Sequence, residues 1–190
     1  MTNKVCIIYT ETNGLHKTNE NVSKKNLYAF ARLVVLNYII GYRNQNKEFI
    51  IEQNIRKIIK PRCMYINNTD FHGITNDIAN TNGIEIENVL NEFNNDIKDI
   101  NIIISHNIDF HLKTLLAEYV RYNIKINITN KIIIDTISFY HKLDFPKLIV
   151  LYSELFPKNK KKKDNLTKIK ECFLELYNQY EQSIININKV

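Results

Sequence analysis

Apolar runs separated by polar stretches predict five β-strands in this chain. Residues 5–10 and 102–104 are continuous apolar runs, as expected of strands that are buried on both faces. Two longer segments flank a turn at residues 43–46 that is rich in asparagine, which tolerates left-handed backbone and is typical of antiparallel pairs. We therefore expect strands at residues 5–10, 29–42, 47–60, 102–104 and 131–135.

Three other segments have apolar residues at the spacing of helix turns. They cover residues 84–96, residues 108–122, where Asn107 precedes as an N-cap, and residues 166–184. Residues 16–26 are polar and rich in lysine and asparagine, which predicts an inserted loop. The side chains expected on the buried faces are Ile86, Val89, Leu90 and Phe93 in the first helix, Phe110, Leu112, Leu115, Leu116 and Tyr119 in the second, and Ile169, Phe173, Leu176 and Tyr180 in the last.

Several short motifs in a fixed order resemble those of the DEDDh 3′-5′ exonucleases, the family of the proofreading subunit of bacterial DNA polymerase III. Residues 8–15, IYTETNGL, are similar to the first motif, which contains Asp-x-Glu. Residues 102–116, IIISHNIDFHLKTLL, resemble the second motif and the helix that follows it. Further matches lie at residues 58–61, 71–75, 135–136, 145–148 and 165–177, so the resemblance covers about residues 4–178.

The resemblance implies an α/β, ribonuclease H-like exonuclease fold. Its mixed five-stranded sheet should have residues 5–10 as the central strand and helices on both faces. We expect a single domain over residues 1–185, followed by a short tail at residues 186–190. Within this fold, Gly73 should occupy a backbone conformation that other residues resist, and Asp135 should cap the segment after its strand.

The positions at which the family binds metal and performs catalysis are largely altered. The family's aspartates are replaced by Tyr9, His111 and Asn165, and its general-base histidine falls on Lys160. Glu11 is the only ligand position that keeps its carboxylate. We interpret these five positions as a vestigial site whose side chains lie together in one cleft. His111 is expected to be a hydrogen-bonding residue paired with Glu11.

Nearby acids do not restore the lost ligands. Asp109 is two residues before His111, about 200° away around a helix, and is better placed to cap the helix start. Asp164 would reach the site only with a shifted register. His106 should point away from it.

Physical chemistry decides what the altered site can hold. A two-metal mechanism needs two cations about 3.5–4 Å apart, and Mg²⁺ prefers carboxylate and water oxygens. One carboxylate cannot hold both ions. We expect no bound metal or cofactor, with Mg²⁺ or Mn²⁺ required if any activity remains.

A lysine run supplies the candidate for nucleic-acid binding. It comprises Lys158, Lys160, Lys161, Lys162 and Lys163, in a segment that borders the substrate cleft in the family. Such a run would bind phosphates without sequence preference and with strong salt dependence. The alternative is a solvated loop, which is how most charge runs behave.

Composition places limits on the class of protein. The chain has 190 residues, a formal net charge of +6 and three cysteines without a CxxC pair, so neither disulfides nor zinc are indicated. It has no apolar run of membrane-spanning length and no signal-peptide pattern, which predicts an intracellular, cytoplasmic protein. Its abundance of isoleucine, asparagine and lysine suggests an AT-rich genome. A large DNA virus is a reasonable source, which would place the protein in the host cytoplasm or the virion.

Three classes of function remain open. The favoured one is a catalytically degenerate exonuclease homologue that serves as a nucleic-acid-binding or protein-interaction module. The second is an active or weakly active exonuclease with an altered site, and the third is a structural or scaffold protein of a virion. Expected partners are single-stranded DNA or RNA, a protein partner or a second copy of the chain, and no membrane.

Overall fold

The structure is a computed structural model that describes residues 4–62, 64–128, 130–140, 144–159 and 162–187, with side chains described as far as Tyr180 except that of Phe139. Five strands form one mixed sheet, in the order β3-β2-β1-β4-β5. They are β1 (Val5–Thr12), β2 (Leu33–Arg43), β3 (Phe49–Ile58), β4 (Ile102–Ser105) and β5 (Ile132–Asp135). β1 is antiparallel to β2 and parallel to β4, so the predicted sheet and its central strand are confirmed.

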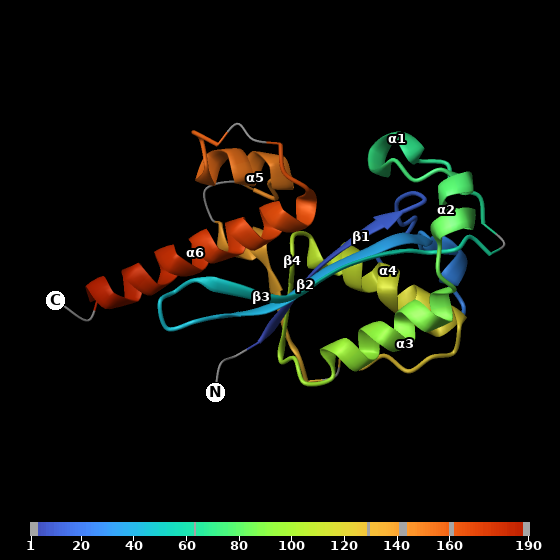
Figure 1. The fold of residues 1–190 in the computed structure, drawn as a ribbon, viewed down its shortest axis with the longest axis horizontal. Coiled ribbons are helices and arrows are strands. Elements are labelled where there is room, and N and C mark those ends of the chain that lie inside the picture. The colour runs from blue at the N-terminus through green and yellow to red at the C-terminus, as the bar shows by residue number, and fades with distance from the viewer. Residues whose placement is uncertain (1–3, 63, 129, 141–143, 160–161, 188–190) are drawn as a thin grey trace.

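Helices cover both faces of the sheet, as predicted (Figure 1). The larger elements are α3 (Ile86–Ile97) and α4 (Ile108–Arg121) on one face, and α5 (Leu148–Leu155) and α6 (Asn165–Ile187) on the other side. Two short helices, α1 (Thr69–His72) and α2 (Asn76–Asn82), and two 3₁₀ turns, η1 (Leu27–Ala29) and η2 (Thr136–Phe139), complete the fold. No helix of the described chain is both long enough and apolar enough to span a bilayer.

The alternation of side chains along β1 decides what each residue faces. Cys6 and Ile8 pack into the core beneath α3 and α4, whereas Val5 and Ile7 pack against α6. Continued along the strand, this alternation turns Tyr9 toward α6 and Thr10 toward α4. Both cysteines whose placement is described, Cys6 and Cys172, are buried and unpaired.

Several local predictions were wrong. β2 begins at Leu33 and not at residue 29, because residues 27–29 form η1. In the hairpin turn the left-handed conformation falls on Lys47, at φ 67°, and not on an asparagine. Tyr180 was expected on the buried stripe of α6, but its exposed fraction is 56% because the helix has passed the sheet there.

The buried face of α4 also differs from the prediction. His111, Thr114 and Glu118 are buried, whereas Phe110, Leu112 and Leu116 are only partly buried. Asn107 does not cap α4, because its backbone is left-handed at φ 60° and its side chain makes no capping bond. The Asp135 carboxylate caps α4 instead, accepting from the backbone N–H groups of Asn107 and Ile108 at 2.9 Å each.

Two predictions about single residues hold. Gly73 ends α1 in the left-handed region at φ 73°. Asp135 caps the segment after β5, where it accepts from the backbone N–H of Ile137 at 3.0 Å. The same carboxylate therefore ties the end of β5 to the start of α4, which fixes one wall of the region described next.

Candidate functional site

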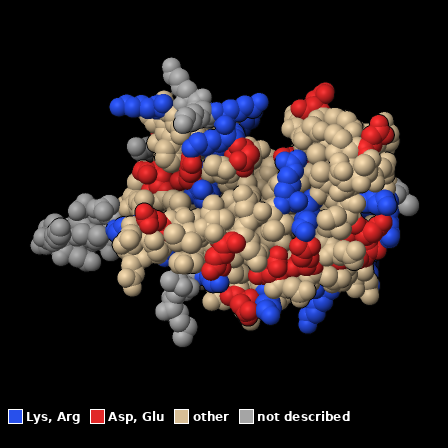
Figure 2. Space-filling view, viewed as in Figure 1, with Lys and Arg blue, Asp and Glu red and all other residues tan. Residues whose placement is uncertain are grey.

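A cleft of about 670 Å³ lies where β1 and β4 end. The end of β1, the start of α4, α1, the segment before α5 and the start of α6 form its walls. On the face shown in Figure 2 the surface is hollowed between the α5 end and the α1 end of the molecule. Tyr9, Glu11, His111 and Asn165 all line this cleft, so the structure brings together four of the five predicted positions. The fifth, Lys160, lies outside the described residues.

Tyr9 occupies the first aspartate position and is held by its neighbours. Its hydroxyl accepts a hydrogen bond from Asn165 Nδ2 at 2.8 Å. Its ring centroid is 4.9 Å from that of His111. Burial, aided by the nearby Glu11, raises the pKa of Tyr9 to about 12, so it carries a neutral phenol at physiological pH.

His111 is buried and bonded to the strand beside it. Its Nδ1 accepts from the Thr10 backbone N–H at 3.1 Å and lies 2.8 Å from Thr10 Oγ1. Burial lowers the pKa of His111 to about 3, so the ring is neutral with its proton on Nε2. The predicted pairing of His111 with Glu11 is therefore wrong, because the alternation of β1 turns Thr10, and not Glu11, toward α4.

Asn165 begins α6 with both ends of its amide engaged. Nδ2 donates to Tyr9, and Oδ1 accepts from Lys168 Nζ at 3.4 Å. The neighbouring Asp164 accepts from Thr167 N at 2.9 Å and Thr167 Oγ1 at 2.6 Å, which makes it the cap of α6. Burial opposes ionisation of Asp164, but the bonds from Thr167 outweigh it and lower its pKa.

Asp109 does not supply a ligand either. Its side chain is 72% exposed and forms an ion pair of 2.8 Å with Lys113. The prediction that Asp109 caps α4 is wrong, because the Asp135 carboxylate accepts from the first N–H groups of this helix.

Glu11 is the only acid among the described residues that line the cleft. Burial raises the pKa of Glu11 to about 7, and the positive charge of Arg56 acts in the opposite direction. At physiological pH the single carboxyl group of the cleft is therefore more protonated than an ordinary glutamate.

The pKa of Glu11 leads to a pH prediction. Since it is raised above the ordinary 4.5, the folded state holds this proton more tightly than the unfolded state. The contribution of Glu11 to the free energy of unfolding is therefore largest below pH 4.5 and declines as pH rises through about 7. We expect Glu11→Gln to match wild type near pH 4 and to be more stable near pH 8, measured by urea unfolding.

Glu92→Gln is the control for that measurement, since Glu92 lies outside the cleft, in a partly exposed pair with Lys57. Its difference from wild type should not change over the same pH range. A Glu11→Gln difference that is equally constant would contradict the raised pKa.

The residues present do not fit a pair of hard divalent cations. Mg²⁺ favours anionic and water oxygens, whereas these positions offer a protonated phenol, a neutral imidazole and an amide whose Nδ2 points at the phenol. In the described part of the chain no three histidine, cysteine or acidic side chains are grouped to hold a metal. His106 was expected to point away from the site but lines the cleft. Its ring nitrogens lie 2.8 Å from Thr136 Oγ1 and from the Pro146 carbonyl.

Three lysines of the run, Lys158, Lys162 and Lys163, lie in the described part of the chain. Lys158 and Lys162 are exposed and are not among the residues that line the cleft. The Lys163 ammonium forms an ion pair of 2.7 Å with Glu171, so its charge is already matched. Lys160 and Lys161 lie outside the described residues. Of the described lysines, only Lys147, just before α5, lines the cleft.

Three large apolar side chains at this cleft were not predicted as functional. Leu15, Phe71 and Phe145 line it and remain 81%, 87% and 82% exposed. Folding normally buries such side chains, so their exposure around one cleft is unusual. The sequence signal was weak, because all three sit in polar segments without periodicity.

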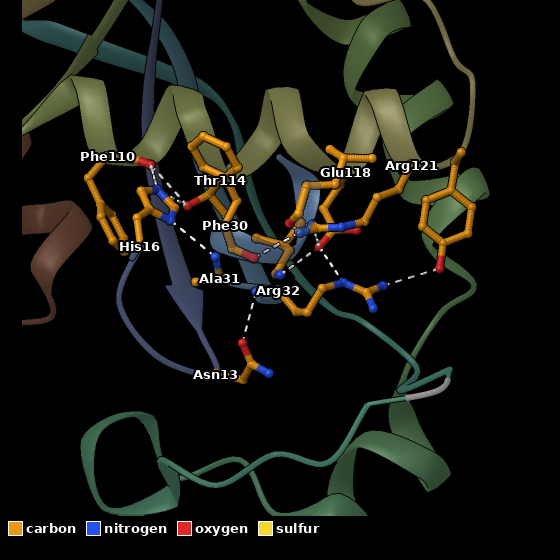
Figure 3. A network of polar contacts seen from close by, with 12 residues as sticks. Asn13, His16, Phe30, Ala31, Arg32, Phe110, Thr114, Glu118 and Arg121 are labelled. Atoms are coloured by element: carbon orange, nitrogen blue, oxygen red, sulfur yellow. Dashed lines mark hydrogen bonds and ion pairs between the residues drawn. The ribbon is translucent and has the colours of Figure 1, made fainter. Parts of the chain in front are cut away.

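A buried polar network next to the cleft was also missed (Figure 3). Glu118, fully buried on α4, accepts at Oε1 from Arg32 Nε and Arg121 Nη1, each at 2.8 Å, and from the Leu33 N–H at 3.1 Å. His16 in the loop after β1 accepts from the Ala31 N–H at 3.1 Å, and its ring stacks on Phe110. The network pins the loop after β1 and the start of β2 to α4.

Comparison with known proteins gives structural neighbours only. No protein-family model matches the chain, and no curated protein sequence matches it. The nuclease domain of 3′hExo, a DEDDh family member bound to rAMP, is similar with a TM-score of 0.68 and 14% identity, over 96% of this chain and 93% of that one.

Two larger proteins contain the same fold. A 3′-exonuclease that recognises the 3′ end of a histone mRNA stem-loop has a TM-score of 0.67 and 15% identity, over 93% of this chain and 63% of that one. Product-bound exonuclease I has a TM-score of 0.66 and 12% identity, and this chain spans 42% of its length. The chain therefore has the ribonuclease H-like fold of the DEDDh exonuclease domains.

Proposed function

We propose that this chain is a catalytically degenerate homologue of 3′-5′ exonucleases that binds single-stranded nucleic acid in the cleft and does not cleave it. The observation that carries the proposal is the bonding among the altered positions. Asn165 bonds Tyr9, Tyr9 packs on His111, and His111 bonds Thr10. The side chains at three positions that hold metal in the family therefore contact one another or the neighbouring strand here.

The cleft remains suited to a nucleotide although its metal ligands are lost. Its volume of about 670 Å³ is within the range of small-molecule sites. Leu15, Phe71 and Phe145 offer apolar surfaces on which bases can stack, and Lys147 adds a positive charge. Structural neighbours support this choice of ligand, since one is bound to rAMP and another is in complex with a dT13 oligonucleotide.

Loss of anionic charge also favours binding without catalysis. A cleft with four carboxylates repels phosphates unless cations are bound, whereas this one has a single carboxyl group whose pKa is raised to about 7. A phosphodiester can therefore enter without metal. Binding should be independent of Mg²⁺ and should weaken as salt rises from about 50 to 200 mM.

Stacking leads to a prediction about affinity. Phe71→Ala and Phe145→Ala should each weaken binding of a labelled oligothymidylate about tenfold, because stacking on an aromatic side chain contributes about 1–3 kcal/mol per base. Fluorescence anisotropy in the presence of a chelator measures this affinity. Tyr65→Ala is the matched control, since Tyr65 is 71% exposed and does not line the cleft.

A hydrolysis assay separates the proposal from its alternatives. Wild-type protein should leave a labelled single strand intact with Mg²⁺ or with Mn²⁺. If wild type degrades the strand and Glu11→Gln abolishes this activity, the protein would be an exonuclease with an altered site. The pKa of about 7 for Glu11 favours this alternative, because general bases work best near this value. A protein that neither binds nor degrades strands would favour a role in protein interaction or virion structure.

A further inference from the structure

A second cleft of about 560 Å³ lies on the other side of the turn that follows β1. Gly14 and Leu15 line both clefts, so the two share one wall. The new cleft extends from this turn to η1, the start of β2 and the end of α4. A chain that leaves the first cleft over Leu15 would enter the second.

The second cleft carries an excess of positive charge. Lys17, Arg32 and Arg121 line it, and its described lining residues include no acid. Glu118 beneath the cleft accepts from both guanidiniums at 2.8 Å and cancels one of their two charges (Figure 3). Lys17 is exposed and has no side-chain partner in the described part of the chain. The surplus is therefore about two positive charges.

The two arginines are fixed before any ligand arrives. Arg121 Nη2 donates to the carbonyls of Leu27 and Phe30, at 2.6 and 2.8 Å, in addition to its bond with Glu118. The side chain of Arg121 is 14% exposed and that of Arg32 is 22% exposed. A guanidinium held in place loses little conformational entropy when an anion binds, which favours a defined anion position over a diffuse one.

An exposed aromatic side chain stands beside these cations. Tyr28 in η1 lines the second cleft and is 85% exposed. A flat ring next to fixed positive charges is the combination that single-stranded nucleic acid uses, with bases stacked on rings and phosphates near cations. A free anion would need the cations but not the ring.

We propose that the second cleft binds the continuation of a single strand whose end lies in the first cleft. Phosphates would lie near Lys17, Arg32 and Arg121, and a base would stack on Tyr28. This inference rests on the proposed function, since it requires a strand in the first cleft, and it adds the direction in which that strand leaves.

Two positions allow a test that leaves the fold intact. Lys17 and Tyr28 are exposed and their side chains lack partners in the described structure, whereas Arg32 and Arg121 belong to the buried network. The test variant is Lys17→Ala with Tyr28→Ala. Its matched control is Lys24→Ala with Tyr65→Ala, which removes the same groups from exposed positions that line neither cleft.

The measurement compares a labelled dinucleotide, which fits the first cleft alone, with an oligothymidylate of about ten nucleotides. For the long strand we expect the test variant to lose about tenfold or more in affinity and its salt slope to fall by about 0.7, the value for one lost phosphate contact. Dinucleotide affinity should not change. The control variant should match wild type with both ligands.

The other outcomes overturn the inference in distinguishable ways. Equal long-strand affinity for the test variant and wild type would exclude the second cleft while the proposed function stands. Wild-type protein that binds neither ligand would overturn both. A third outcome is that inorganic phosphate stabilises the protein against heat only when Lys17 is present, whereas strand affinity does not depend on Lys17. The second cleft would then be a site for free anions, and the strand would be rejected as its ligand.

Discussion

Restoring the family's acids should convert this protein into a Mg²⁺-dependent nuclease. The variant combines Tyr9→Asp, His111→Asp and Asn165→Asp with Lys160→His, so that Glu11 gains three carboxylate neighbours in the same cleft. Their shared location makes two cations about 3.5–4 Å apart feasible, which the wild-type donor set does not allow. We expect hydrolysis of a labelled single strand with Mg²⁺ and none with a chelator.

Stability should report metal binding independently of activity. Without metal, the variant should be less stable than wild type by about 2–4 kcal/mol, because it loses the Tyr9 ring and the His111–Thr10 bond and gains mutual repulsion. At a concentration about 100 times its dissociation constant, Mg²⁺ should return about 2.7 kcal/mol through linkage. Thermal unfolding with and without Mg²⁺ measures both changes.

The control keeps the shape of the new side chains and omits their charge. Tyr9→Asn with His111→Asn, on the native Asn165, should gain neither Mg²⁺ stabilisation nor activity. Single substitutions to aspartate should also do little, because one added acid cannot hold the second ion. Nuclease activity in wild type equal to that of the restored variant would overturn the proposed function.

The largest loss of stability should come from Glu118→Ala. Glu118 is fully buried and its Oε1 accepts from Arg32, Arg121 and the Leu33 N–H. Removing it leaves two partly buried guanidiniums without a counter-ion and the Leu33 N–H without an acceptor, which typically costs about 3–5 kcal/mol. For a chain of 190 residues, this lowers the melting temperature by about 6–20 °C.

Glu92→Ala is the matched control on the neighbouring helix. Its pair with Lys57 is partly exposed, with 43% of the Glu92 side chain accessible, so its loss should change stability by only about 1 kcal/mol. Calorimetry of the two variants at neutral pH provides the comparison. A Glu118→Ala variant as stable as Glu92→Ala would mean that water readily replaces the carboxylate, and that the network does not hold the loop after β1.

The sequence determined the fold and the order of its elements. Continuous apolar runs in residues 5–10 and 102–104 are typical of strands in the middle of a sheet covered on both faces, and that is where β1 and β4 lie. The spacing of Ile86, Val89, Leu90 and Phe93 fixed the buried face of α3 in the same way. Motif order also placed Tyr9, Glu11, His111 and Asn165 near one another.

Partners within the site were decided only by the tertiary structure. Whether His111 bonds Glu11 or Thr10 depends on which face of β1 turns toward α4, and the pKa of Glu11 depends on the burial that follows. The sequence around Glu118 does not distinguish it from a surface acid, yet it is the buried acceptor for two arginines. Arg32 is distant along the chain, and Arg121 is one helix turn after Glu118. Local patterns encode burial and periodicity, whereas a hydrogen bond between distant residues depends on how strand, loop and helix meet in space.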